Sequence, residues 1–249
     1  MTFSVATHLH RGRLGSFFGL IGIFGVTLPS QAEAAGGAFV VDDAAVGKAG
    51  SCKVESWASF ADNGDRNAVS NPACVFDLGK PVEIGMLFQH ARAGDQWTTS
   101  LGPKLKVNFL PVETGRVGLG LAGGTSADVT THGPGISFVY VPVTFAVRDD
   151  FKINVNAGWL HEGAANLQWM IWGGGIEWEF RKPFTFIAEV FGQVGHDTPE
   201  QPSVSRPRLQ AGLRYTPKSN IDIDVIYGRN LAGENANWLT VGLNLRFGD

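Results

Sequence analysis

Hydrophobic and polar residues alternate one by one along most of this chain. In residues 239–247, Leu, Val, Leu, Leu and Phe at the odd positions alternate with Thr, Gly, Asn and Arg. Because successive side chains of a strand point to opposite faces, this pattern predicts a strand with one apolar and one polar face. The apolar face must meet either a second sheet, as in a soluble sandwich, or lipid, as in a membrane barrel.

The same alternation predicts twelve strands, and no helical period of any length competes with them. Pro72 interrupts the second strand, and proline is disfavoured in central strands, so a count of ten is the alternative. The predicted strands are 52–60, 67–78, 82–92, 96–109, 115–124, 136–147, 151–161, 168–180, 184–195, 206–216, 221–229 and 238–247.

The connections between these strands differ in length at alternate positions. The short set is 78–81, 111–115, 148–150, 181–183 and 217–220, and the mostly longer set is 61–67, 93–95, 124–135, 161–166, 196–205 and 230–237. Short turns at one end and longer loops at the other are typical of an outer-membrane barrel.

Aromatic residues gather at both ends of the predicted strands, whereas the middles of the apolar stripes are aliphatic. At the short-turn end they are Phe109, Phe145, Phe151, Trp178, Phe180, Phe184, Tyr215 and Phe247, and at the long-loop end Trp97, Trp159, Trp169, Tyr227 and Trp238. Two aromatic belts around an aliphatic band fit a bilayer, while a sandwich would concentrate its rings in mid-core. The sequence therefore predicts an antiparallel up-and-down transmembrane β-barrel over residues 52–249, surrounded by outer-membrane lipid.

The first 34 residues have the features of an export signal. Two arginines precede the apolar stretch "LGSFFGLIGIFGVTL", and Ala32-Glu33-Ala34 is a small-x-small cleavage site. A membrane-anchoring helix is the alternative, but the apolar run is short for a span of roughly 20 residues. We therefore expect residues 1–34 to be a signal peptide and residues 35–51 to be a periplasmic amino-terminal segment.

Cys52 and Cys74 are the two cysteines of the chain. In an exported protein without a CxxC motif or a nearby histidine, they predict a disulfide rather than a metal or redox pair. Pairing Phe60 with Arg66 around the first loop brings Cys52 opposite Cys74, at a separation that a disulfide can span.

Nothing in the sequence predicts catalysis, a cofactor or a metal site. The formal net charge is −3 and no basic run is present, which also argues against a nucleic-acid partner. A lipid-facing Ser-His arrangement, as in outer-membrane phospholipase, fails because the strand beside His90 places Ser100 on the inner face. His132 with Asp128, and His196 with Asp197 and Glu200, are interpreted as solvated loop residues because they lack a familiar metal-ligand spacing.

The charged residues of the polar stripes are predicted to line the lumen. They are Glu83, Lys104, Lys106, Arg116, Lys152, Glu177, Glu179, Glu189, Arg208, Arg214, Asp222, Asp224 and Arg246. Both signs occur in similar number, which argues against a strongly ion-selective pore. Pairing Tyr215 with Ile221 across the hairpin at 217–220 would place Asp222 between Arg214 and Arg246.

Two stretches resemble known families. The ending "LTVGLNLRF" resembles the carboxy-terminal signal of outer-membrane barrels, although Gly248 and Asp249 follow the usual terminal aromatic. The stretch "VVDDAAVGKAGSCKVESWASFADN" is similar to the start of a transporter family associated with meta-pathway phenol degradation. The matching positions are Asp42, Asp43, Ala44, Gly47, Lys48 and Glu55. This second resemblance implies aromatic or other hydrophobic solutes and no catalytic residues.

The sequence thus predicts a monomeric, porin-like barrel in a Gram-negative-type outer membrane that allows passive passage of small solutes. A plugged structural or surface-interaction barrel, whose extracellular loops bind partners, is the alternative. A dozen strands enclose a lumen narrow enough for either.

Overall fold

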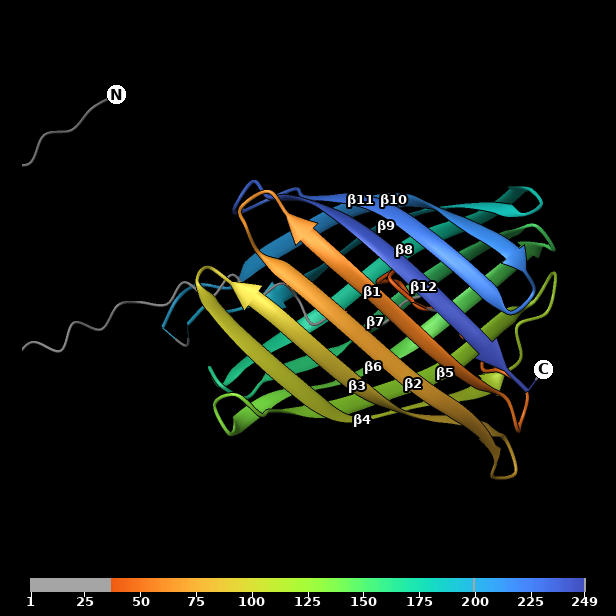
Figure 1. Cartoon of the computed structure of the whole chain (residues 1–249), viewed down its shortest axis with the longest axis horizontal. Coiled ribbons are helices and arrows are strands. Elements are labelled where there is room, and N and C mark those ends of the chain that lie inside the picture. Colours follow the sequence, from red (N-terminus) through yellow and green to blue (C-terminus); the bar gives the residue numbers. More distant parts are fainter. Residues whose placement is uncertain (1–36, 199, 249) are drawn as a thin grey trace, which may run out of the picture.

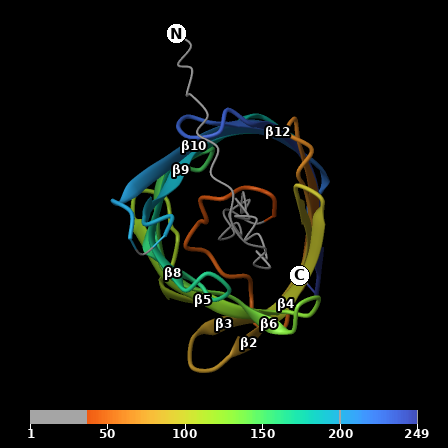
Figure 2. The ribbon, with the colours of Figure 1, turned by 90° about the vertical axis from the view of Figure 1, so that its left-hand side faces the viewer.

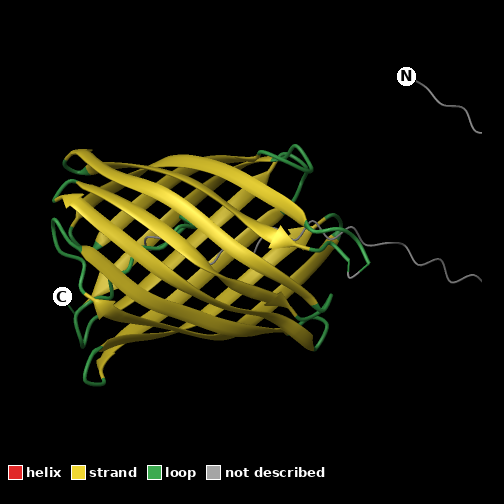
Figure 3. Cartoon of the chain, turned by 180° about the vertical axis from the view of Figure 1, so that it is seen from behind, coloured by secondary structure: helices red, strands yellow, loops and turns green. Residues whose placement is uncertain are grey.

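The computed structural model describes residues 37–198 and 200–248, which form twelve antiparallel strands closed into one barrel (Figure 1). Among these residues no helix is long and apolar enough to cross a membrane (Figure 3). The strands are β1 (Cys52–Ala61), β2 (Arg66–Asp77), β3 (Pro81–Ala93), β4 (Gln96–Leu110), β5 (Val117–Asp128), β6 (Gly133–Arg148), β7 (Phe151–Glu162), β8 (Leu167–Arg181), β9 (Phe184–Gly195), β10 (Val204–Lys218), β11 (Ile221–Asn230) and β12 (Asn237–Phe247). The predicted fold class is confirmed. The predicted signal peptide, residues 1–34, lies outside the described residues.

Each strand pairs with its neighbour in sequence, and β1 closes the ring against β12. Pro72 does not break β2, because the β2–β3 ladder passes from Ser70 to Ala73 without it. Proline has no amide hydrogen to donate, so it is tolerated where the ladder is interrupted. The count of twelve is therefore confirmed over the alternative of ten.

The barrel is apolar outside and polar inside. In β12, Leu239 and Val241 are 46% and 45% exposed, whereas Thr240 between them is 0% exposed. A water-soluble protein would bury the leucine and valine and expose the threonine. The observed arrangement suits an outer face in contact with hydrocarbon.

Two tryptophans depart from the predicted aromatic belts. Trp97, Trp159 and Tyr227 face outward as predicted, but Trp169 and Trp238 are buried inside the barrel. Trp238 directly precedes the outward Leu239, so strand alternation turns it inward. The interior at this end is therefore aromatic.

The two ends of the barrel are named here by their connections. The loop end carries residues 62–65, 94–95, 129–132, 163–166, 196–203 and 231–236, and the turn end carries 78–80, 111–116, 149–150, 182–183 and 219–220 together with the start of β1 and the end of β12. The predicted long connection 124–135 is wrong, because most of it extends β5 and β6. Antiparallel pairing of the polar residues continues the ladder to Asp128 and Gly133.

Side-chain hydrogen bonds join two connections at the loop end. The Asp62 carboxylate accepts bonds from the backbone and side-chain nitrogens of Asn237, at 3.0 and 2.7 Å. These bonds lower the pKa of Asp62 below its usual value. Asn63 also donates to Glu234 at 3.0 Å, so the first and last connections of this end are held together.

The hairpin between β10 and β11 has a different register from the predicted one. Tyr215 pairs with Ile223 rather than Ile221, and the ladder shifts between Tyr215 and Lys218. A shift of two residues keeps every side chain on its predicted face, so alternation alone could not detect it. As a result Arg214 lies opposite Asp224.

Candidate functional site

The interior of the barrel holds the chain segment that precedes β1. Residues 37–51, named here the inner segment, run inside the ring of strands (Figure 2) and form neither helix nor strand. We expected a periplasmic position for residues 35–51, and the structure instead buries Phe39, Val41, Asp42 and Ala44 almost completely. The lumen is thus occupied by part of the same chain.

Side chains of the barrel wall satisfy the backbone of the inner segment. The Glu189 carboxylate accepts from the amides of Val40 and Val41 at 2.9 and 3.1 Å. The Asn156 side chain bonds both the amide and the carbonyl of Asp42, at 2.6 and 2.8 Å. Buried amides must find partners, and here the wall provides them without adding the segment to a sheet.

Farther along the inner segment, two more wall residues bind the backbone of Ala44. Its amide donates to the Thr144 hydroxyl at 2.8 Å, and its carbonyl accepts from the Asn108 side chain. Thr144 in turn donates to Asn154 at 2.8 Å. Polar residues at inward positions of β4, β6 and β7 therefore hold this part of the segment in place.

Asp42 anchors the centre of the inner segment by its side chain. Its carboxylate accepts from Lys106 Nζ and from the Tyr140 hydroxyl, each at 2.8 Å. Lys106 also lies 3.3 Å from Asp43. Both members of the Asp42–Lys106 pair are buried, and removing one partner of such a pair typically costs about 3–5 kcal/mol.

The first part of the inner segment is apolar and packs into an apolar layer of the lumen. The layer joins Ala38, Phe39 and Val41 to wall residues Trp57, Val69, Leu87, Ile187, Phe191, Ile226 and Trp238. The Arg214 guanidinium lies 5.5 Å from the centre of the Phe39 ring. This contact is a cation–π interaction that helps hold the ring.

The glycine run of β8 makes room for the inner segment. Gly173 faces inward, and a Cβ there would come within 2.7 Å of Val41 Cγ2. A Cβ on the next residue, Gly174, would meet no heavy atom within 4 Å. Only a residue without a side chain allows the segment to approach the wall this closely.

Beside the inner segment, toward the turn end, lies a cavity of about 310 Å³. Its lining consists of Asp43, Ala45, Val46, Gly47, Ser51, Cys52, Lys53, Glu55, Val75, Glu83, Lys106, Lys152, Glu177, Arg214, Asp222, Asn244 and Arg246. Lys53 Nζ pairs with Glu55 at 3.0 Å and with Glu83 at 3.2 Å. Charges of both signs therefore face one another across a small polar space.

Asp222 lies between Arg214 and Arg246, as predicted. It pairs with Arg246 and is 3.9 Å from Arg214 Nε. The stronger contact of Arg214 is with Asp224, which accepts two bonds of 2.8 and 3.0 Å because of the register shift described above. Asp224 also accepts from the Asn244 side chain at 3.0 Å.

The residues predicted to line the lumen divide into two groups. Buried in the interior or lining its cavity are Glu83, Lys104, Lys106, Lys152, Glu177, Glu189, Arg208, Arg214, Asp222, Asp224 and Arg246. Arg116 was predicted wrongly, since it lies outside the strands and is exposed, and Glu179 is exposed at the turn end of β8. Arg116 pairs there with Glu113 at 2.7 Å, because it precedes β5 and is not part of the wall.

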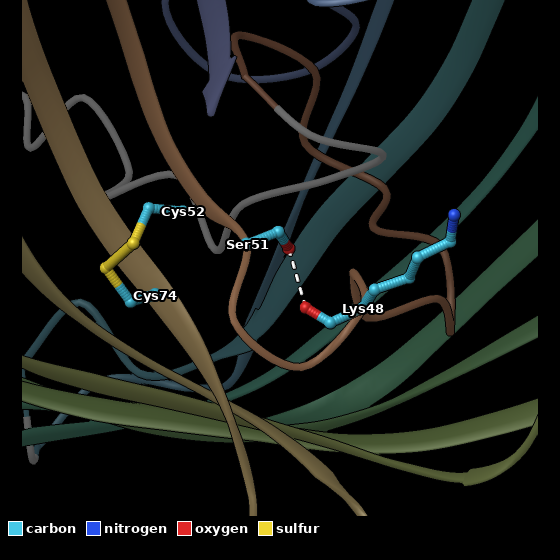
Figure 4. The surroundings of a disulfide bond; sticks show 4 residues. All are labelled: Lys48, Ser51, Cys52 and Cys74. Carbon is cyan, nitrogen blue, oxygen red and sulfur yellow. Dashed lines mark hydrogen bonds between the residues drawn. A yellow bond between two sulfur atoms is a disulfide. The ribbon is translucent and has the colours of Figure 1, made fainter. Parts of the chain in front are cut away.

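The disulfide between Cys52 and Cys74 is confirmed, and it lies where the inner segment enters β1 (Figure 4). Both predicted pairs, Phe60 with Arg66 and Cys52 with Cys74, occur in the β1–β2 ladder. Next to the disulfide, the Ser51 hydroxyl donates to the Lys48 carbonyl at 2.7 Å. The carboxy-terminal end of the inner segment is therefore joined firmly to the wall.

The polar loop residues considered for metal binding have other partners. Asp128 accepts from the backbone amide of Thr130 at 2.8 Å, and Asp197 pairs with Arg206. His196 contacts the Gln201 carbonyl at 2.6 Å. Over the described ranges no group of three or more His, Cys, Asp or Glu side chains is placed to hold a metal ion.

The chain matches the family model described as Uncharacterised conserved protein UCP029691 over residues 24–247. The chain belongs to this family. No curated protein matches it. The family description states no activity.

Solved outer-membrane barrels share the fold of this member of the family. The COG4313 outer membrane channel from Pseudomonas putida F1 has a TM-score of 0.61 at 10% identity, covering 82% of this chain and 97% of that one. The NanC porin has a TM-score of 0.59 at 9% identity, with coverages of 77% and 98%. The KdgM porin has a TM-score of 0.58 at 12% identity, with coverages of 79% and 99%. The predicted resemblance to outer-membrane barrels is thereby confirmed at the level of the fold.

Proposed function

We propose that the protein is an outer-membrane channel through which small solutes pass, and that the inner segment closes the middle of its lumen. The loop end faces the outside and the turn end faces the periplasm, as is usual for barrels of this class. The protein acts as a monomer and not as an enzyme. The observation that carries the proposal is the occupation of a closed barrel by a segment bound through wall side chains.

This mode of binding indicates that the inner segment is a gate that can leave the lumen, and not a permanent part of the barrel wall. The segment is not a strand of the barrel, so the ring of backbone hydrogen bonds stays complete when the segment leaves. Each hydrogen bond to the wall contributes about 0.5–1.5 kcal/mol net, since water can replace the wall as partner. Departure of the segment is therefore costly but compatible with an intact barrel.

The lining of the lumen supports aromatic or other hydrophobic compounds as the solutes. In the half nearer the loop end, Phe138, Trp169, Phe191 and Trp238 all face inward and are buried. Apolar walls with a few polar groups are typical of sites for small organic molecules. The family resemblance noted in the sequence points to the same class of solute.

Conductance in a planar bilayer tests the proposal with two neighbouring substitutions. Gly173→Val places a side chain against Val41 and should expel the inner segment, so its conductance should exceed that of the wild type several-fold. Gly174→Val adds the same side chain to the outer face, where nothing is within 4 Å of its Cβ, and should conduct like the wild type. Folding of each variant is checked by heat-modifiable gel mobility.

The alternative is a plugged barrel with a structural or surface-interaction role, and the filled lumen is the observation in its favour. In that case both glycine variants would fold and insert but conduct no better than the wild type. If the wild type and both glycine variants show equal, negligible conductance, the channel proposal is rejected in favour of the structural barrel.

A further inference from the structure

The interior near the loop end contains a buried cation that the barrel itself does not neutralise. Arg208 lies on β10, is 7% exposed, and is opposite Phe191 on β9 and Asn230 on β11. Leu209, the next residue, is exposed on the outer face, so alternation directs Arg208 inward. An arginine remains charged in a protein, and burying a charge without a partner is costly.

The acidic residues of this region interact with groups other than Arg208, and Glu162 of β7 interacts with Arg206 and Trp169. Asp197 pairs with Arg206, two residues before Arg208 on the same strand face. Glu189 accepts from Val40, Val41 and Gln210 of the inner segment and β10. Within the part of the chain that the structure describes, Arg208 makes neither a hydrogen bond nor an ion pair.

Three buried aromatic side chains face inward in the same half of the barrel, on β8, β9 and β12. Phe191 and Trp238 belong to the apolar layer of the lumen, and Trp169 lies nearer the loop end. The Arg206 guanidinium is 5.6 Å from the centre of the Trp169 ring. The wall from β8 to β12 therefore carries one guanidinium against a ring, that of Arg206, and a second, Arg208, directly opposite Phe191 in the ladder.

Arg208 lies nearer the loop end than the contacts that the wall makes with the inner segment. Gln210, two residues farther along β10, donates to Glu189 at 2.8 Å, and Glu189 in turn binds the inner segment. A solute that entered from the loop end would reach Arg208 before it reached the inner segment. The position is that of an entry site rather than an exit site.

We propose that Arg208, assisted by Arg206, binds the carboxylate of a small aromatic acid whose ring lies among Trp169, Phe191 and Trp238. A guanidinium can hold a carboxylate through two parallel hydrogen bonds, and apolar rings favour an apolar body over a hydrated inorganic ion. The inference deepens the proposed function, because it names the chemical class of the solute and the place where it first binds.

Benzoate binding to the purified full-length protein in detergent, measured by calorimetry and by quenching of tryptophan fluorescence, tests the site. Arg208→Gln should weaken benzoate binding about 10- to 100-fold, the usual effect of losing hydrogen bonds to a charged group. Arg208→Lys should restore part of the affinity, because it keeps the charge without the paired donors. Arg229→Gln, at an exposed position of β11, should bind like the wild type.

Two ligands related to benzoate separate the parts of the proposal. Benzyl alcohol keeps the ring without the charge, and acetate keeps the carboxylate without the ring, so both should bind more weakly than benzoate. Unchanged benzoate affinity in Arg208→Gln would overturn the site, and acetate binding as tight as benzoate binding would overturn the aromatic class. Heat-modifiable mobility identifies any variant that has not folded, in which case Arg206→Gln provides the second test.

The two experiments distinguish rejection of the proposed binding site from rejection of the proposed channel function. Benzoate binding that depends on Arg208 in a protein without conductance would reject passage and keep the site. If Gly173→Val conducts but Arg208→Gln binds benzoate as tightly as the wild type, the channel function is supported and the binding site is rejected.

Discussion

The Asp42–Lys106 pair gives the sharpest test of how firmly the inner segment is held. Asp42→Asn removes the charge but keeps the size of the side chain and an oxygen that can accept from Tyr140. Lys106 loses its contact at 2.8 Å and retains the one to Asp43 at 3.3 Å. Removing one partner of a buried pair costs about 3–5 kcal/mol, and the remaining aspartate argues for the lower value, about 3 kcal/mol.

This loss should appear as local opening of the inner segment. About 3 kcal/mol corresponds to a shift of roughly 150-fold in the ratio of bound to released segment. The amides of Val41 and Ala44 donate to Glu189 and Thr144, so their hydrogen exchange reports that ratio. Exchange of these two amides should accelerate by roughly this factor, while the amides of the strands keep their protection.

Asp95→Asn is the matched control, because this carboxylate is fully exposed at the loop end and contacts Arg92 on the surface. It should leave exchange in the inner segment unchanged. Unaltered exchange in Asp42→Asn would refute the reasoning about the ion pair. Equal acceleration in the segment and in all strands would show that the segment and the barrel open as one unit, which would refute the gate.

Three further outcomes follow from the contacts of the wall. Mass spectrometry of unreduced protein should find no free thiols, and replacing Cys52 and Cys74 by alanine should lower the free energy of unfolding by about 3 kcal/mol. Asp224→Ala should cost about 3–5 kcal/mol in unfolding from lipid, and Asp222→Ala should cost less, because the main arginine partner of Asp222 is partly exposed. Val225→Arg, which places a charge on the lipid-facing side, should destabilise the barrel in lipid by about 2–4 kcal/mol, and no loss would contradict the membrane assignment.

The twelve strands, their faces and the first hairpin could be predicted from the sequence because they depend on local rules. Alternation with a period of two assigns each residue of 239–247 to a face without any knowledge of the neighbouring strand. The disulfide followed from pairing across one short loop, because the pairing of Phe60 with Arg66 places Cys52 opposite Cys74. The same rule placed Trp238 inside, and only its position near the loop end suggested a belt instead.

The two-residue shift at Tyr215 shows where such rules stop. A bulge that preserves the faces leaves no trace in the pattern of hydrophobic and polar positions, so the partner of Arg214 depended on the actual ladder. Arg116 failed for a related reason, because a residue just outside a strand continues the alternation without belonging to the wall. Hydrogen bonding to the neighbouring strand decides where a strand ends, and the pattern of hydrophobic and polar positions carries no information about that pairing.

The filled lumen was decided by the tertiary structure alone. Asp42 and its neighbours have no strand or helix pattern, and their partners come from β4, β6, β7 and β9. These side chains are far apart along the chain and form one binding surface only when β1 meets β12 and the ring closes. The sequence by itself determined a barrel with a polar interior, because alternation is local, whereas closure of the ring decided what fills that interior, because contacts across a lumen have no period along the chain.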